Sequence, residues 1–87
     1  MYKLHFKKSV KKDLKRIGEA ASLRILKAIK EKLLPEPTMG KPLKGSDGEL
    51  WSFRVGNYRV IYNFNNNDLT VLVIRISHRR EVYKNIE

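Results

Sequence analysis

The chain has 87 residues, no cysteine and two histidines, and 19 Lys and Arg against 9 Asp and Glu give it a formal net charge of +10. This length predicts a single domain over residues 1–87, and 41% hydrophobic residues argue against full disorder. Without cysteine there are no disulfides or thiolate zinc sites, and two lone histidines argue against any metal. No apolar run approaches the ~18 residues of a membrane span, and no signal-peptide stretch follows Met1, so we expect a soluble, cytoplasmic protein without membrane attachment.

The first part of the chain predicts a strand followed by two helices. Residues 2–6 alternate apolar and polar side chains, which is typical of a strand. Ser9 is the expected N-cap of a first helix that ends at Gly18, and a second helix is expected over residues 19–34. The apolar side chains at helical spacing are Val10, Leu14 and Ile17 in the first helix, and Ile25, Leu26, Ile29 and Leu33 in the second.

Prolines and glycines predict a loop over residues 35–49, where Pro35 and Pro37 stop the second helix. Two strands are expected next, over residues 50–55 and 58–64. Gly56-Asn57 between them suits a two-residue hairpin turn.

An asparagine-rich turn then leads to a last strand over residues 69–76, and a polar tail covers residues 77–87. Apolar residues alternate on both faces of this strand, with Leu72, Ile74 and Ile76 on one and Val71 and Val73 with Arg75 on the other, which indicates a central strand. The order β-α-α-β-β-β predicts an α+β fold: a largely antiparallel four-stranded sheet with the helix hairpin packed on one face.

The hairpin brings two arginines together. A two-residue turn places Arg54 opposite Arg59, on the face that also carries Ser52 and Ile61. The opposite, helix-covered face carries Trp51, Phe53, Val55, Tyr58, Val60 and Tyr62. Like charges in direct cross-strand contact destabilise a sheet by roughly 0.2–1 kcal/mol, and an anion held between them would relieve this. The alternatives are that both side chains splay into water or that they meet an acidic residue elsewhere.

The positive charge is unevenly divided. Residues 1–49 have a net charge of +7, mostly from lysine, whereas residues 50–87 have +3, nearly all from arginine. Lysine is a hydrated point charge and arginine is a planar fork that grips phosphate. The lysines therefore indicate an electrostatic footprint for a polyanion, or simply a solvated surface, and the arginines indicate a site. Near the C-terminus, residues 77–83 add an imidazole, two guanidiniums and a phenol, the groups used in phosphoryl chemistry.

Four segments carry a family resemblance: Leu43-Lys44-Gly45, Leu50-Trp51-Ser52-Phe53-Arg54-Val55, Asn57-Tyr58-Arg59-Val60-Ile61-Tyr62 and His78-Arg79-Arg80-Glu81-Val82-Tyr83. Together with the opening strand and the helix pair they resemble the toxins of the RelE/ParE superfamily over nearly the whole chain. The resemblance implies a RelE-like toxin domain of a type II toxin–antitoxin pair. It further implies a ribosome-dependent endoribonuclease, in which a ribose 2′-OH of mRNA attacks the adjacent phosphate and leaves a 2′,3′-cyclic phosphate, without metal or cofactor.

The same resemblance implies catalytic roles for matching residues. Arg59 would stabilise the pentacovalent phosphorane, and Arg54 would neutralise phosphate or help activate the 2′-OH. Arg79 would contact phosphate, and Tyr83 would stack on or orient a base and assist proton transfer. His78 stands where some relatives carry a catalytic histidine and others a lysine.

One position departs from the pattern. RelE-like enzymes often have a lysine, proposed as a base or charge stabiliser, at the position that Ser52 occupies here. His78, Lys41 and Lys44 are the candidates to replace it, and Lys44 also matches a basic loop residue that contacts the RNA backbone. The expected RNA-binding residues are Lys7, Lys11, Lys15, Lys41, Lys44 and Arg80.

Two other functions remain open at this point. ParE-like members share the fold but inhibit DNA gyrase, and the loss of lysine at Ser52 favours them, whereas Arg59, Arg79 and Tyr83 favour the nuclease. A non-catalytic basic domain that binds RNA or the ribosome is the other alternative. In the toxin interpretation the partners are the ribosome, mRNA and an acidic, RelB-like antitoxin. That antitoxin would lay an amphipathic helix across the sheet or the groove of the helix pair.

Overall fold

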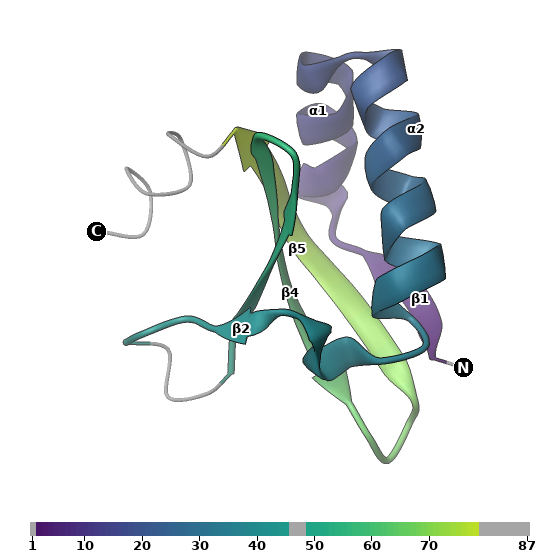
Figure 1. Cartoon of the computed structure of the whole chain (residues 1–87), viewed down its shortest axis with the longest axis vertical. Coiled ribbons are helices and arrows are strands. Elements are labelled where there is room, and N and C mark those ends of the chain that lie inside the picture. Colours follow the sequence, from purple (N-terminus) through teal and green to yellow (C-terminus); the bar gives the residue numbers. More distant parts are fainter. Residues whose placement is uncertain (1, 46–48, 79–87) are drawn as a thin grey trace.

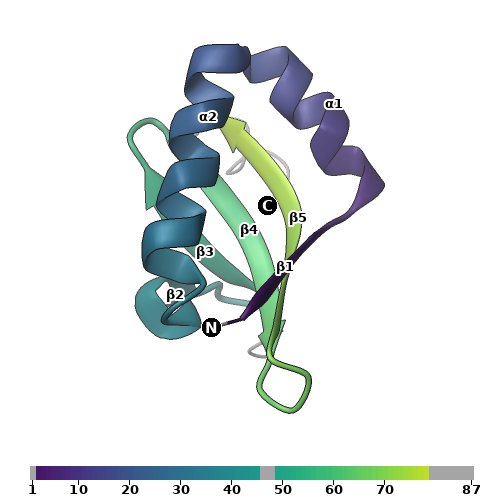
Figure 2. The ribbon, with the colours of Figure 1, turned by 90° about the vertical axis from the view of Figure 1, so that its right-hand side faces the viewer.

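A computed structural model describes residues 2–45 and 49–78. Two helices pack on one face of a single twisted sheet (Figures 1 and 2). The other face carries no helix among these described residues and is here called the helix-free face. The elements are β1 (Lys3–Phe6), α1 (Lys8–Ile17), α2 (Glu19–Ala28), β2 (Lys41–Pro42), β3 (Trp51–Val55), β4 (Tyr58–Asn65) and β5 (Thr70–His78). The α+β class, the helix hairpin and the β3–β4 hairpin are as predicted. The polar tail was expected to begin at residue 77, but β5 continues through Ser77 and His78, so that start is wrong. The remainder of the expected tail, residues 79–87, lies outside the described residues.

The sheet is five-stranded and mixed, where four strands were expected. Its order is β1-β5-β4-β3-β2, with β1 parallel to β5 and the other pairs antiparallel. The additional strand, β2, lies inside the predicted loop and is only two residues long, which is too short to leave a periodic pattern. The helices connect β1 at one edge of the sheet to β2 at the other edge, and the chain then returns through β3 and β4 to β5, which lies parallel to β1.

The helices differ from expectation at their ends. α1 begins at Lys8 with Lys7 as its N-cap, so the prediction of Ser9 as N-cap is wrong. The Ser9 hydroxyl instead donates to the carbonyl of Ile74 in β5, at 3.1 Å. The second helix runs close to its predicted end but widens into a π-helical turn over Ile29–Leu33. None of the helices within residues 2–45 and 49–78 is long and apolar enough to cross a membrane.

The core lies between the helices and one face of the sheet. The predicted stripes of both helices meet the predicted inner face of the β3–β4 hairpin there, which confirms these assignments for every residue except Leu26, which is not part of the core. Its buried members include Val10, Ile25, Ile29, Leu33, Phe53, Val60, Tyr62, Val71, Val73 and Ile76. Each buried aliphatic side chain of this size contributes roughly 1.5–3 kcal/mol relative to exposure.

The faces of β5 were predicted correctly as far as Val73 and wrongly beyond it. Ile61 pairs with Arg75 and Tyr62 with Val73, so Ile74 is an extra residue opposite a register shift in β4. This bulge reverses the alternation, so that Val73 and Ile76 both point into the core. β5 is central, between β1 and β4, as its apolar composition indicated.

Candidate anion-binding site

Arg54 and Arg59, here called the arginine pair, are direct cross-strand partners as predicted. They lie on the sheet face opposite the core, with Arg54 exposed and Arg59 partly buried. Arg54 Nε donates to the carbonyl oxygen of Gly56 at 3.3 Å. Arg59 Nη1 donates to Ser52 Oγ at 3.2 Å, and this buried serine thereby orients one edge of the guanidinium.

The arginine pair lines a hollow of about 360 Å³, called the arginine hollow. Its lining residues are Lys32, Met39, Gly40, Lys41, Ser52, Phe53, Arg54 and Arg59. Four of them are cations and none of these lining residues is a carboxylate, so the hollow suits an anion. A larger hollow of about 620 Å³ at the other end of β4 is lined by Glu49, Trp51, Asn63, Phe64 and Asn65, and holds none of the predicted catalytic residues.

Lys41 reaches the arginine hollow through β2. It pairs with Ser52, and directly paired residues of neighbouring strands project to the same face. Gly40 permits the close approach, since a Cβ there would lie 2.5 Å from Tyr62 Oη and 2.6 Å from the Ser52 carbonyl oxygen. The buried Tyr62 hydroxyl also donates to the Pro37 carbonyl, which fastens this segment to the sheet.

The other residues predicted for the site do not lie in the arginine hollow. His78 pairs with Tyr58, and their rings meet edge to face with centroids 5.7 Å apart, on the face opposite the arginine pair. Lys44 is exposed and does not line the arginine hollow. Of the three candidates to replace a lysine at Ser52, Lys41 is the one that the structure places there. Arg79, Arg80 and Tyr83 lie outside the described residues.

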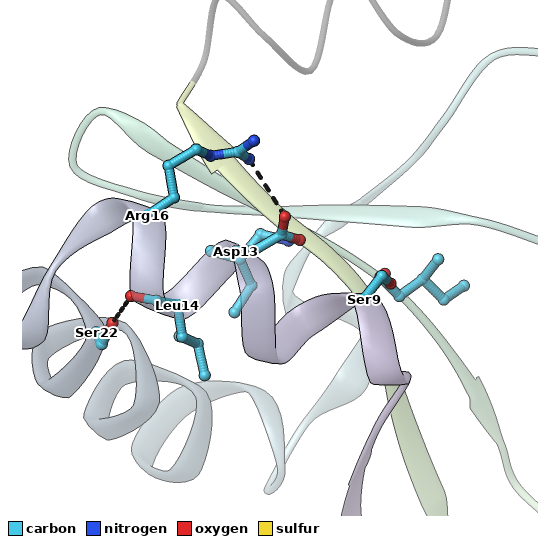
Figure 3. A network of polar contacts seen from close by, with 7 residues as sticks. Ser9, Asp13, Leu14, Arg16 and Ser22 are labelled. Atoms are coloured by element: carbon cyan, nitrogen blue, oxygen red, sulfur yellow. Dashed lines mark hydrogen bonds and ion pairs between the residues drawn. The ribbon is translucent and has the colours of Figure 1, made fainter.

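A second basic hollow of about 390 Å³, called the edge hollow, lies where α1 crosses β5. Its lining residues are Lys7, Ser9, Lys12, Asp13, Arg16, Ile74 and Arg75. Asp13 is buried and forms an ion pair with Arg16, with 3.2 Å between Oδ1 and Nη2 (Figure 3). Its Oδ2 accepts a hydrogen bond from the backbone N–H of Ile76 at 3.0 Å. Of the lysines predicted to bind RNA, Lys7 lies here, whereas Lys11 and Lys15 are exposed on α1 and line neither hollow.

Burial raises the pKa of Tyr62 from 10.0 to about 12, although the backbone hydrogen bond of Gly40 lowers it in part. Because the folded state favours the neutral phenol, its contribution is present below pH 10 and is lost as the pH rises through 12. We expect the free energy of unfolding to fall by about 2 kcal/mol across this range. Urea unfolding of the wild type and of Tyr62→Phe at each pH measures this, and two parallel curves would contradict it.

The fold and the two hollows describe a small basic protein with a candidate anion site on the face of its sheet opposite the helices. Residues 4–83 match the model of a family described as the ParE toxin of the type II toxin–antitoxin system parDE. The chain is also 32% identical to Toxin RelG of Mycobacterium tuberculosis over 88 residues, covering 95% of this chain and 97% of that protein. The chain therefore belongs to the ParE toxin family, within the RelE/ParE superfamily.

Solved structures agree with this assignment. The toxin–antitoxin complex RelBE2 from M. tuberculosis matches with a TM-score of 0.81 and 28% identity, over 90% of this chain and 98% of the matched chain. The RelB–RelE complex from Methanococcus jannaschii gives 0.72 and 28%, over 95% and 99%. The isolated RelE toxin of E. coli, at 0.74 and 22% over the whole of both chains, shares the fold.

Proposed function

We propose that this toxin is an endoribonuclease that cleaves mRNA on the ribosome. The observation that carries the proposal is the arginine pair, held in direct cross-strand contact beside Lys41 in a hollow whose lining has no carboxylate. A sheet gains no stability from two adjacent guanidiniums, but a phosphate between them gains two bidentate donors.

The chemistry that suits this hollow is a phosphoryl transfer within the RNA chain. The ribose 2′-oxygen attacks the adjacent phosphorus, the bond from phosphorus to the 5′-oxygen breaks, and a 2′,3′-cyclic phosphate remains. The 2′-hydroxyl gives up its proton and the leaving 5′-oxygen takes one up. In our proposal, Arg59 contacts the phosphorane oxygens, where negative charge builds up, and Arg54 and Lys41 neutralise the phosphate as the strand approaches.

We further propose an acidic antitoxin as the partner of this +10 chain. Two of the matched structures are complexes of a toxin with its antitoxin, from M. tuberculosis and M. jannaschii. An acidic partner would neutralise the surface charge and speed association. Failure of the purified chain to bind the acidic protein encoded beside it would contradict this.

Inhibition of DNA gyrase is the second candidate, because the matching family model is described as a ParE toxin. Serine at position 52, where RelE-like enzymes often have lysine, also favours it.

One experiment tests both candidates. The wild type and a variant with Arg54→Gln and Arg59→Gln are expressed, mRNA 5′ ends are mapped, and plasmid supercoiling is measured. Lys27→Ala is the matched control, since Lys27 is exposed on α2 and lines neither hollow. We expect new ends within codons for the wild type and the control, and none for the double variant. Growth arrest with intact mRNA and altered supercoiling would favour gyrase instead.

A further inference from the structure

On the helix-free face, four neighbouring strands contribute one residue each to a single row. Lys41 pairs with Ser52, Ser52 with Ile61, and Ile61 with Arg75. All four side chains therefore project to the face that holds the arginine pair. The row has a cation at each end: Lys41 lines the arginine hollow and Arg75 lines the edge hollow.

Arg75 has a buried hydrogen-bond donor that is available to a ligand. The bulge at Ile74 turns it to the helix-free face, where it is partly buried. Its Nε is buried and has no hydrogen-bond partner within the described part of the chain. A buried donor left unsatisfied destabilises the folded chain, and an incoming acceptor oxygen would remove that penalty.

The edge hollow is positively charged around Arg75. Lys7, Lys12 and Arg16 add three more cations to its lining, and Asp13 is its one carboxylate. Both oxygens of that carboxylate are already engaged, Oδ1 by Arg16 and Oδ2 by the Ile76 N–H, so a net positive charge remains for a ligand.

We infer that the edge hollow binds backbone phosphates of the same RNA strand whose reacting phosphate lies in the arginine hollow. This inference rests on the proposed function and adds a second subsite to it. The shared face favours RNA over an acidic peptide, because Arg75, two residues along β5 from the Ser77 that pairs with Arg59, is the next cation that a strand leaving the arginine pair meets there. A phosphate group also accepts two parallel hydrogen bonds from one planar guanidinium.

The separation of the two hollows sets the length of RNA that reaches both. The arginine pair lies on β3 and β4, so a phosphate between its members is one and a half strand spacings from β5, or about 7 Å at about 4.8 Å each. Arg75 lies two residues along β5 from Ser77, the partner of Arg59, which adds about 7 Å along the strand and gives a separation of about 10 Å. A stacked strand advances about 3.4 Å per phosphate, so about three phosphate steps span this distance. A trinucleotide, with its two internucleotide phosphates, therefore reaches one hollow, and a decanucleotide reaches both.

Binding of 2′-O-methyl RNA tests the inference, since a methylated 2′-oxygen cannot attack and the measurement reports binding alone. The full chain and Arg75→Gln are titrated with a trinucleotide and a decanucleotide over a range of salt, with Lys27→Ala as the control. For Arg75→Gln we expect about tenfold weaker binding of the decanucleotide and a log–log salt slope shallower by about 0.7. Binding of the trinucleotide should stay within about twofold. Lys12→Ala, at an exposed lysine of the same hollow, repeats the test without disturbing a partly buried side chain.

Three outcomes overturn the inference. Equal weakening for both lengths would mean that Arg75 acts through the arginine hollow or the fold. Weaker binding of a deca-glutamate peptide alone would assign the hollow to an acidic partner. Weaker binding of ribosomes without a length effect would assign the phosphates to ribosomal RNA. If the length effect appears but the wild type cuts no mRNA, the cleavage proposal fails while the edge hollow stands.

Discussion

Arg59→Gln is expected to lower the rate of RNA cleavage by about 10²–10³-fold, the usual effect of removing one donor to a developing anion. The same substitution should leave the free energy of unfolding within about 1 kcal/mol of the wild type, with a shift toward greater stability. The reason is that Arg59 faces Arg54 directly, so removing its charge relieves a cross-strand repulsion. Glutamine keeps part of the side-chain stem and a neutral N–H donor.

Single-turnover cleavage on programmed ribosomes and urea unfolding of the same preparations measure the two effects. Arg59→Lys is the matched variant, because it keeps the charge and loses the planar fork, and we expect an intermediate rate. A fall in activity that merely followed a fall in stability would mean that Arg59 is structural. Unchanged cleavage would exclude it from the reaction.

Asp13→Ala is expected to lower the free energy of unfolding by about 3 kcal/mol, or the melting temperature by about 15 °C. β1 ends at Phe6, which pairs with Val73. Beyond this point the backbone groups on the exposed edge of β5 form hydrogen bonds with side chains of α1 instead of with a neighbouring strand. Ser9 donates to the Ile74 carbonyl and Asp13 accepts the Ile76 N–H. Alanine at position 13 would leave that buried N–H without an acceptor.

Two companion variants separate the hydrogen bond from the ion pair. Asp13→Asn keeps an acceptor for the Ile76 N–H and should cost about 1 kcal/mol. Arg16→Ala removes only the ion pair and should cost less than about 1 kcal/mol, because 48% of the arginine side chain is exposed. Equal losses for Arg16→Ala and Asp13→Ala in urea unfolding would contradict this account.

The β3–β4 hairpin could be read from the sequence because Gly56-Asn57 determines a register that extends to Trp51 and Tyr62. The arginine pair followed from the same two residues. Other features leave no local signal: β2 is only one period of alternation long, and the bulge at Ile74 depends on how β5 pairs with its neighbour. Ser9 has the chemistry of an N-cap, but a strand carbonyl lies within its reach.

The candidate site was predictable to the same extent. Lys41 was among the expected residues, whereas Lys32, Gly40 and Tyr62 were not. Lys32 and Gly40 line the arginine hollow, and Tyr62 holds the Gly40 segment in place, because the fold brings distant segments into contact. A close approach such as that of Gly40 is visible only in three dimensions. His78 was expected beside the arginines, but it lies on the other face because consecutive strand residues alternate.

The sheet separates the residues that hold the fold together from those of the arginine hollow: the apolar core lies under the helices and the arginine pair faces away from them. In our proposal, loss of either guanidinium therefore lowers toxicity without unfolding the chain. Such a mutant would still be made and would still fold. In a cell that has lost its antitoxin, selection can thus favour a single nucleotide change that inactivates this protein and leaves its fold intact.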